Sequence, residues 1–178
     1  MLLGTEAAEF RLLEMIHDIF ESRFTDFIMP RITALGNAGI IWIILAAVLL
    51  CIPRYRRCGA VLAAGLLAGL VFGNLLIKPL IHRPRPCWLY EVQLITKIPS
   101  DYSFPSGHTY SSFTAAFPLL RYNKRWGIAA LALAVLIAFS RMYLYAHFPT
   151  DVLGGIVLAV AVSTAVTAID KRIETKEI

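Results

Sequence analysis

Residues 32–53 read ITALGNAGIIWIILAAVLLCIP, and after a short basic linker residues 58–77 read CGAVLAAGLLAGLVFGNLLI. Neither stretch contains a charged residue, and each has the length of about 20 residues that an α-helix needs to cross a bilayer. Three further apolar runs follow at about residues 106–120, 126–145 and 150–169. We therefore predict an all-α, polytopic membrane helix bundle with five transmembrane helices. The third run is the weakest of the five, because it is short and contains several hydroxyl side chains.

The composition supports a membrane protein. Of the 178 residues, 58% are hydrophobic and only 16% are charged, and the mean hydropathy is +0.67. Soluble domains are about 45–50% apolar and about 25% charged, and a small soluble chain could not bury so much apolar surface. This composition excludes a disordered chain, a collagen-like chain and a disulfide scaffold. The three cysteines, Cys51, Cys58 and Cys87, are too few and too scattered for a zinc site or a disulfide framework.

The chain is expected to form a single membrane domain, in which residues 1–30 are an amphipathic helix, residues 31–170 the bundle and residues 171–178 a cytoplasmic tail. In the first segment, Phe and Leu side chains recur at helical spacing opposite Glu and Asp. This pattern fits a helix at the membrane interface, or equally a helix packed on the bundle. Its charges are too dense for a sixth span. No basic segment followed by an apolar core begins the chain, so we expect no cleavable signal peptide.

The net charge of +5 indicates membrane topology rather than a nucleic-acid partner, because the basic residues form short clusters between apolar runs. Nine Lys and Arg lie in the linkers after the first and third runs and in the tail, and eight lie on the other side. The nine are packed tightly against span ends. We therefore expect a cytoplasmic C-terminus and an extracytoplasmic N-terminus and long loop, although the inverted topology stays open.

The polar residues gather at one end of the predicted bundle. Since five spans alternate in direction, the end of the second, the start of the third, the end of the fourth and the start of the fifth share one membrane face. Those four places contain Lys78, Arg85, Ser106, Gly107, His108, Ser140, Arg141, His147 and Asp151. Such convergence is typical of a site built at the end of a helix bundle.

Three cations in this group, Lys78, Arg85 and Arg141, would repel one another without an anion between them. Arginine has a planar fork of donors that suits phosphate oxygens. The backbone N–H groups of Ser106 and Gly107 would be free at the start of the third helix and would point at a bound anion. Any one of the cations alone could simply extend to the interface, but the whole set predicts a phosphate-binding site.

Two histidines would supply reactivity at this phosphate. His147 and Asp151 are four residues apart, so a helical turn could bring them together, and the carboxylate would orient the imidazole. His147 could attack phosphorus as a nucleophile, and His108 could protonate the leaving oxygen. The spacing alone does not decide which histidine attacks, although the proximity of Asp151 favours His147. The other histidines, His17 and His82, are interpreted as capping or interfacial residues.

A metal mechanism is the competing chemistry, because two His and one Asp could bind zinc. Three nearby cations would oppose a divalent metal, and no second carboxylate lies close in these motifs. We therefore expect neither a metal nor another cofactor. Cys87, close to Arg85, is expected to be a bystander.

Small residues mark close helix packing. Gly65, Gly69 and Gly73 form a ridge on the second span, and Gly154 and Gly155 lie near the start of the fifth. Such glycines are typical of contacts between membrane helices.

The polar motifs resemble the three signatures of the type 2 phosphatidic acid phosphatase superfamily. The matching residues are Lys78-(six residues)-Arg85-Pro86, then Pro105-Ser106-Gly107-His108, then Ser140-Arg141-(five residues)-His147-(three residues)-Asp151. The resemblance implies a metal-independent phosphatase that works through a phosphohistidine. It implies His147 as nucleophile, Asp151 as its partner and His108 as general acid. It also implies phosphate binding by Lys78, Arg85, Ser106, Gly107 and Arg141.

The superfamily also includes soluble vanadium-dependent haloperoxidases, but the apolar spans favour a membrane lipid phosphatase. We expect hydrolysis of undecaprenyl diphosphate, phosphatidylglycerophosphate or phosphatidic acid at the extracytoplasmic face of a bacterial plasma membrane. The sequence leaves the lipid and the oligomeric state open. The alternatives are a lipid phosphotransferase that uses the same histidine, and a non-catalytic lipid-binding or transport protein.

Overall fold

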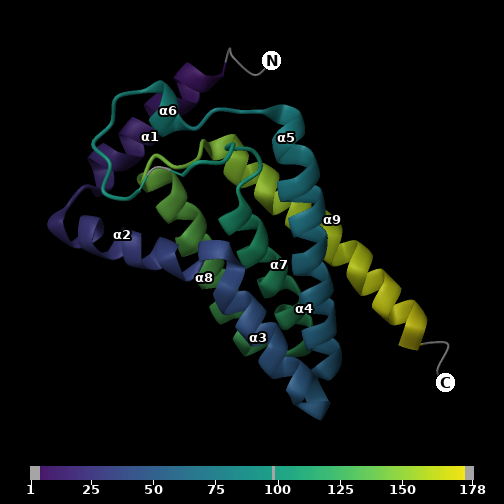
Figure 1. Cartoon of the computed structure of the whole chain (residues 1–178). Helices are drawn as coiled ribbons and strands as arrows, with labels where there is room; N and C mark the ends of the chain where they lie inside the picture. Colours follow the sequence, from purple (N-terminus) through teal and green to yellow (C-terminus); the bar gives the residue numbers. More distant parts are fainter. Residues whose placement is uncertain (1–4, 98, 175–178) are drawn as a thin grey trace.

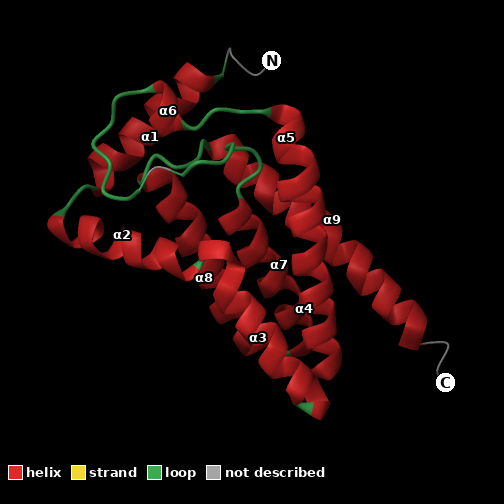
Figure 2. Cartoon of the chain, in the orientation of Figure 1, coloured by secondary structure: helices red, strands yellow, loops and turns green. Residues whose placement is uncertain are grey.

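The computed structural model describes residues 5–97 and 99–174, and the part of the chain it describes is helical, without a strand (Figure 2). The helices are α1 (Glu6–Phe20), α2 (Arg23–Leu35), α3 (Ile40–Cys51), α4 (Arg56–Gly69), α5 (Lys78–Ile81), α6 (Pro86–Leu89), α7 (Gly107–Tyr122), α8 (Lys124–Tyr143) and α9 (Pro149–Glu174). A π-helical stretch, Leu70–Ile77, joins α4 to α5, and short 3-10 turns cover Asn37–Gly39 and Pro53–Tyr55.

The structure confirms an all-helical membrane bundle, and each of the five predicted apolar runs contains a helix. Four helical segments of the described chain are long and apolar enough to cross a membrane: Arg23–Cys51, Pro53–Leu89, Lys124–Tyr143 and Pro149–Ile173. Helix α7, the third predicted span, has only 16 residues. The count of five complete spans therefore stays a prediction.

Helix α7 lies at the centre of the bundle, where it packs against α4, α8 and α9 (Figure 1). Ten of its 16 residues are buried. Because its neighbours cover it, several hydroxyl groups on α7 face protein instead of lipid; the Trp42 indole N–H, for example, donates to Ser112 Oγ at 3.0 Å. Enclosure by protein explains why this run has the weakest hydropathy of the five.

The predicted glycine ridge is confirmed as the surface on which α4 and the π-helical stretch meet α7 and α9. A Cβ at Gly69 would lie 1.4 Å from the Tyr110 ring, and one at Gly65 would lie 2.6 Å from Thr114. The Tyr110 hydroxyl donates to the Gly65 carbonyl, which holds the ring in the groove. In the second pair, Gly155 lets α9 approach α7, since its Cβ would lie 3.1 Å from Thr109 Cβ, and Gly154 makes room for Phe104 of the loop before α7.

We expect Gly69→Ala to lower the stability of the bundle, because the buried Tyr110 ring leaves no room for a methyl group. Overpacking of this kind costs about 1–3 kcal/mol or more. Thermal unfolding in detergent measures the loss. The matched control is Gly73→Ala, whose new methyl group would lie 3.3 Å from the flexible end of Leu158. If both variants melted at the wild-type temperature, the close approach of α4 to α7 would be wrong.

The N-terminal segment differs from the single amphipathic helix predicted for residues 1–30, of which 1–4 lie outside the described residues. Two helices form instead, because the Ser22 side chain accepts a hydrogen bond from Thr25 N and starts α2 anew. The expected boundary at residue 30 falls inside α2. Helix α1 packs on the bundle through Phe10 and Leu13, which is the second of the two alternatives.

A sharp turn, Asn37–Gly39, joins α2 to α3 and brings the end of α2 to the start of α7. Ala38 and Gly39 have positive φ angles of 51° and 66°, so the chain changes direction within a few residues (Figure 1). A Cβ at Gly36 would lie 2.7 Å from His108 Cδ2. Glycine therefore lets this turn pack directly against the start of α7.

Candidate active site

A cavity of about 970 Å³ extends from the long loop and the start of α7 to side chains of α3 and α4. Six of the predicted site residues line it: Lys78, Arg85, Gly107, His108, Arg141 and His147. The two other predicted residues, Ser106 and Asp151, are fully buried. The structure therefore brings the three motif segments together at one place, as the sequence predicts.

Arg85 is the side chain that connects the loop to His147. Its Nη1 donates to the Ala146 carbonyl at 2.7 Å and lies 3.0 Å from His147 Nε2. Its Nε and Nη2 bind the backbone carbonyl and the carboxylate of Asp101 at 2.7 and 2.6 Å. These bonds hold the planar fork of donors at the cavity beside the imidazole.

The contacts of His147 determine its tautomer. A guanidinium has only donors, so the contact with Arg85 requires an unprotonated Nε2. Nδ1 then carries the proton and donates to Ser103 Oγ at 3.2 Å, and that hydroxyl donates to Asp151 Oδ2. The direct distance from His147 Nδ1 to Asp151 Oδ2 is 3.6 Å. The carboxylate therefore orients the imidazole mainly through Ser103, and the electron pair of Nε2 accepts from Arg85 beside the cavity.

The surroundings of His147 favour a neutral imidazole. Burial, followed by the charges of Arg85, Arg141 and Lys78, lowers the pKa of His147 well below its ordinary value of 6.5. Both causes disfavour the imidazolium form.

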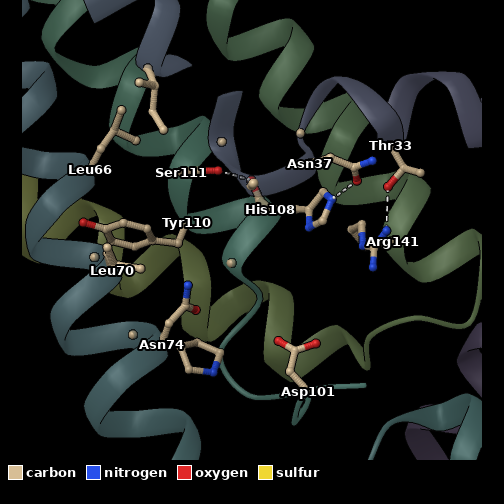
Figure 3. A pocket seen from close by; sticks show the side chains of 18 of the residues that line it. Thr33, Asn37, Leu66, Leu70, Asn74, Asp101, His108, Tyr110, Ser111 and Arg141 are labelled. Atoms are coloured by element: carbon tan, nitrogen blue, oxygen red, sulfur yellow. Dashed lines mark hydrogen bonds between the residues drawn. The ribbon is translucent and has the colours of Figure 1, made fainter. Parts of the chain in front are cut away.

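The turn between α8 and α9 explains the spacing from Arg141 to His147. The backbone N–H groups of Ala146 and His147 both donate to the Arg141 carbonyl, at 3.0 and 3.2 Å, and Tyr145 has a positive φ of 52° within the turn. The Arg141 side chain is held from the other side, where Nη1 donates to Thr33 Oγ1 of α2 at 2.7 Å (Figure 3).

Ser106 requires a correction, because its backbone N–H is not free for an anion. It donates to the Asp151 carbonyl at 3.0 Å, since the start of α9 packs against this turn. The Ser106 hydroxyl caps α7 by accepting from Thr109 N and Thr109 Oγ1. Gly107 does line the cavity, so the helix start can still offer an N–H group there.

His108 faces the cavity from the first turn of α7 and is held by the turn between α2 and α3. Its Nε2 lies 3.0 Å from Asn37 Oδ1, and Figure 3 shows the amide and the ring side by side. A carbonyl oxygen only accepts, so Nε2 carries a proton in this arrangement. His108 thus has an N–H group that Asn37 holds at the edge of the cavity, close to Arg141 in the same view.

Asp101 is a site residue that the motifs did not indicate. Its carboxylate binds Lys78 as well as Arg85. Burial alone would raise the pKa of Asp101, but the hydrogen bond from Lys78 and the charge of Arg85 hold it well below its usual range. Asp101 therefore stays ionised and keeps the two cations aligned along the cavity wall.

Three further residues of the site could not be found from the motifs: Asn37, Arg83 and Ser103. Arg83 is buried and donates to Asp151 Oδ1 at 2.6 Å. Each lies in a turn or loop that only the fold brings to the site. The one sequence signal is position, since Arg83 is one of the six residues between Lys78 and Arg85, and Ser103 lies two residues before Pro105 of the second motif.

Within the described structure, the remaining histidines and Cys87 have their contacts away from the side chains of His108 and His147. His17 packs against the rings of Tyr143 and Tyr145. His82 is exposed and packs edge-on against Tyr102. The backbone N–H of Cys87 donates to Tyr145 O at 3.3 Å. Among the described residues, no three His, Cys, Asp or Glu side chains gather as a metal site.

Comparison with known proteins gives three consistent findings. A family model described as the PAP2 superfamily matches residues 58–174. The undecaprenyl-diphosphatase BcrC of Bacillus subtilis is 31% identical over 156 residues, which cover 86% of this chain and 79% of that protein. An undecaprenyl-diphosphatase of Sulfolobus acidocaldarius is 34% identical over 117 residues, which cover 65% of this chain and 56% of that protein.

Among solved structures, the crystal structure of a transmembrane PAP2-type phosphatidylglycerolphosphate phosphatase from Bacillus subtilis superimposes with a TM-score of 0.77. The two chains are 25% identical, and the match covers 96% of this chain and 88% of the other. The likeness therefore extends over the bundle as well as the motifs.

Proposed function

The chain belongs to the PAP2 superfamily and superimposes on a transmembrane PAP2-type phosphatase, and we propose that it hydrolyses a lipid phosphate or diphosphate through a phosphohistidine on His147. The reaction takes place on the extracytoplasmic face of the membrane in the topology that the basic clusters favour. The protein acts on lipid in the bilayer without a metal ion or another cofactor.

One observation carries the choice of a lipid substrate: the cavity continues from the histidines into an apolar groove. Ile43, Ala47 and Leu50 of α3 and Leu66 and Leu67 of α4 line the same cavity as His147. Leu50 is one residue from the end of α3, so the groove follows almost the whole helix. A phosphate at Arg85 could therefore keep its hydrocarbon tail between two membrane helices.

The proposed chemistry has two steps. His147 Nε2 attacks phosphorus, the P–O bond to the lipid breaks, and the leaving oxygen takes the proton of His108. Water then attacks the phosphohistidine while His108 takes back a proton, so inorganic phosphate leaves and both histidines are restored. Lys78, Arg85 and Arg141, with the N–H of Gly107, stabilise the charge on the equatorial oxygens.

Undecaprenyl diphosphate is the substrate we favour, on the basis of two relatives that carry this name. The groove also suits phosphatidylglycerophosphate and phosphatidic acid, because the side chains of α3 and α4 that line it, Ile43, Ala47, Leu50, Leu66 and Leu67, are apolar.

The proposal is tested with a substrate panel and a groove variant. Purified protein in detergent with excess EDTA is expected to release phosphate from lipid phosphates, with the highest kcat/KM on the isoprenoid diphosphate. Ala47→Trp should fill the groove and raise KM for long-tailed lipids while short-chain phosphates are hydrolysed as before. The control is Ala132→Trp, an exposed site on α8. Loss of activity on chelation would overturn the metal-free mechanism. If Ala47→Trp raised KM equally for long-tailed and short-chain substrates, the groove would not be the binding site of the tail.

A further inference from the structure

A second group of buried charges lies behind Asp151, and Arg83 is at its centre. Arg83 Nη1 donates to Asp151 Oδ1 at 2.6 Å, and Nη2 donates to Glu9 Oε1 of α1 at 2.8 Å. Glu6, one helical turn earlier, lies 3.7 Å from Arg83 Nε. The Arg83 guanidinium also lies over the Phe148 ring, 4.4 Å from its centroid. One arginine thus connects the N-terminal helix to the carboxylate that orients His147.

Glu9 also fixes the start of α9. Its second oxygen accepts from the backbone N–H of Thr150 at 3.1 Å and from the Thr150 hydroxyl at 2.7 Å. The first N–H groups of a helix have no partner within the helix, so a carboxylate placed there both caps the helix and favours its dipole. Asp151 is the next residue. Its Oδ2 accepts from Phe148 N at 2.8 Å, which closes the same turn.

The burial of this group argues that it serves the site. Arg83 is 3% exposed and Asp151 is 0% exposed, and Glu6 and Glu9 are also buried. Buried ion pairs add little net stability, because desolvation opposes the attraction between the charges. A group of three carboxylates around one arginine is therefore costly to assemble. The group fixes the position of the Asp151 carboxylate. Arg83 binds Oδ1, and Oδ2 accepts from Ser103 and lies 3.6 Å from His147 Nδ1.

We propose that Arg83 and Glu9 are positioning residues for the phosphatase reaction, so that helix α1 supports catalysis through Asp151. This inference rests on the proposed roles of His147 and Asp151. Arg83 fixes the carboxylate, and Glu9 fixes both Arg83 and the first turn of α9. Neither residue lines the cavity within the described structure, so both act on the rate of the chemical step and not on the binding of phosphate.

The test compares Arg83→Lys and Glu9→Gln with the wild type in phosphate release from the preferred lipid phosphate. We expect kcat to fall about 10- to 100-fold in each, as for other partners that orient a reacting group, while KM stays within about two-fold. The matched control is Tyr143→Phe. It removes the 2.6 Å hydrogen bond from Tyr143 to Asp26 of α2, another link to the N-terminal segment that does not involve Asp151, and it should keep the wild-type kcat.

The decisive measurement repeats both substitutions in an Asp151→Asn background. If Arg83 and Glu9 act through Asp151, they lower kcat there by less than about two-fold, because the group they position is already lost. A drop as large as in the wild-type background, or a wild-type kcat in both single variants, would overturn the proposal. Thermal unfolding of every variant distinguishes a protein that has lost its fold from a folded protein whose Asp151 carboxylate is displaced.

A second measurement does not depend on which lipid is the substrate. It records how far orthovanadate, a phosphate-like anion, raises the melting temperature of the protein. The Arg83→Lys and Glu9→Gln proteins should show a smaller shift in melting temperature with vanadate than the wild type, if a misplaced imidazole forms a weaker bond to vanadium. An unchanged shift in both contradicts the positioning role. A wild-type protein that binds vanadate but releases no phosphate from any lipid contradicts the proposed function instead.

Discussion

Replacing His147 by Gln is expected to abolish turnover while the protein still folds. The imidazole Nε2 is the group that attacks phosphorus in the proposed reaction, and an amide has no comparable nucleophile. Removal of a nucleophile from a comparable hydrolytic site costs several orders of magnitude, so we expect a loss of at least about 10³-fold in kcat. Gln is the chosen substitution because its amide oxygen can still accept from Arg85, which keeps that buried guanidinium partnered.

The measurement is phosphate release combined with rapid acid-free quenching of protein incubated with ³²P-labelled lipid phosphate. Wild-type protein should carry label that is stable to base and labile to acid, as expected of a phosphohistidine, and His147→Gln should carry none. His82→Gln is the matched control, because His82 is an exposed histidine of the same loop region. Labelled His147→Gln protein would show that another residue is the nucleophile.

Replacing His108 by Gln is expected to have the second largest effect, and the effect should depend on the leaving group. Loss of a general acid costs about 10²–10⁴-fold when the departing alkoxide is strongly basic, as in phosphatidic acid. An aryl phosphate such as p-nitrophenyl phosphate needs no such proton. Asn37 lies 3.0 Å from the His108 ring nitrogen, and it can hold the substituted amide in the same position.

Pre-steady-state kinetics gives the sharpest view of this variant. With the aryl phosphate, His108→Gln should release a rapid burst of nitrophenol equal to the enzyme concentration and then accumulate phosphoenzyme, because the second step also needs His108 as a base. With phosphatidic acid, the first step itself should be slow, and no phosphoenzyme should accumulate. The same fold-loss in the first step for both substrates would contradict the general-acid role.

The helix bundle could be predicted because each membrane helix is specified by its own stretch of sequence. Charge-free runs of about 20 residues specify membrane helices one at a time, and alternation then places the motif residues at one end. The glycine ridge could be predicted for the same reason, since small residues at helical spacing mark close packing without reference to a particular partner. In the structure, the partner that packs against Gly69 is the Tyr110 ring.

The parts that could not be predicted depend on contacts between distant segments. Glu9 and Thr150 are 141 residues apart, and nothing in either local sequence points to the other. For Ser106, a distant segment removes a feature that the local sequence predicts. A residue at a helix start offers a free N–H by local rules, but here the Asp151 carbonyl of α9 takes it. Arg83 could not be singled out, because Arg85, two residues later, already satisfies the phosphate motif.

The contact between Glu9 and Thr150 also has a consequence for how the protein is made. The Glu9 carboxylate leaves the ribosome 141 residues ahead of Thr150, which emerges together with His147 and Asp151. A growing chain that has inserted α1 to α8 therefore still lacks the proposed nucleophile, the carboxylate that orients it and the helix start that Glu9 caps. The proposed site is complete only when α9 has joined the bundle and reached the helix made first among those described.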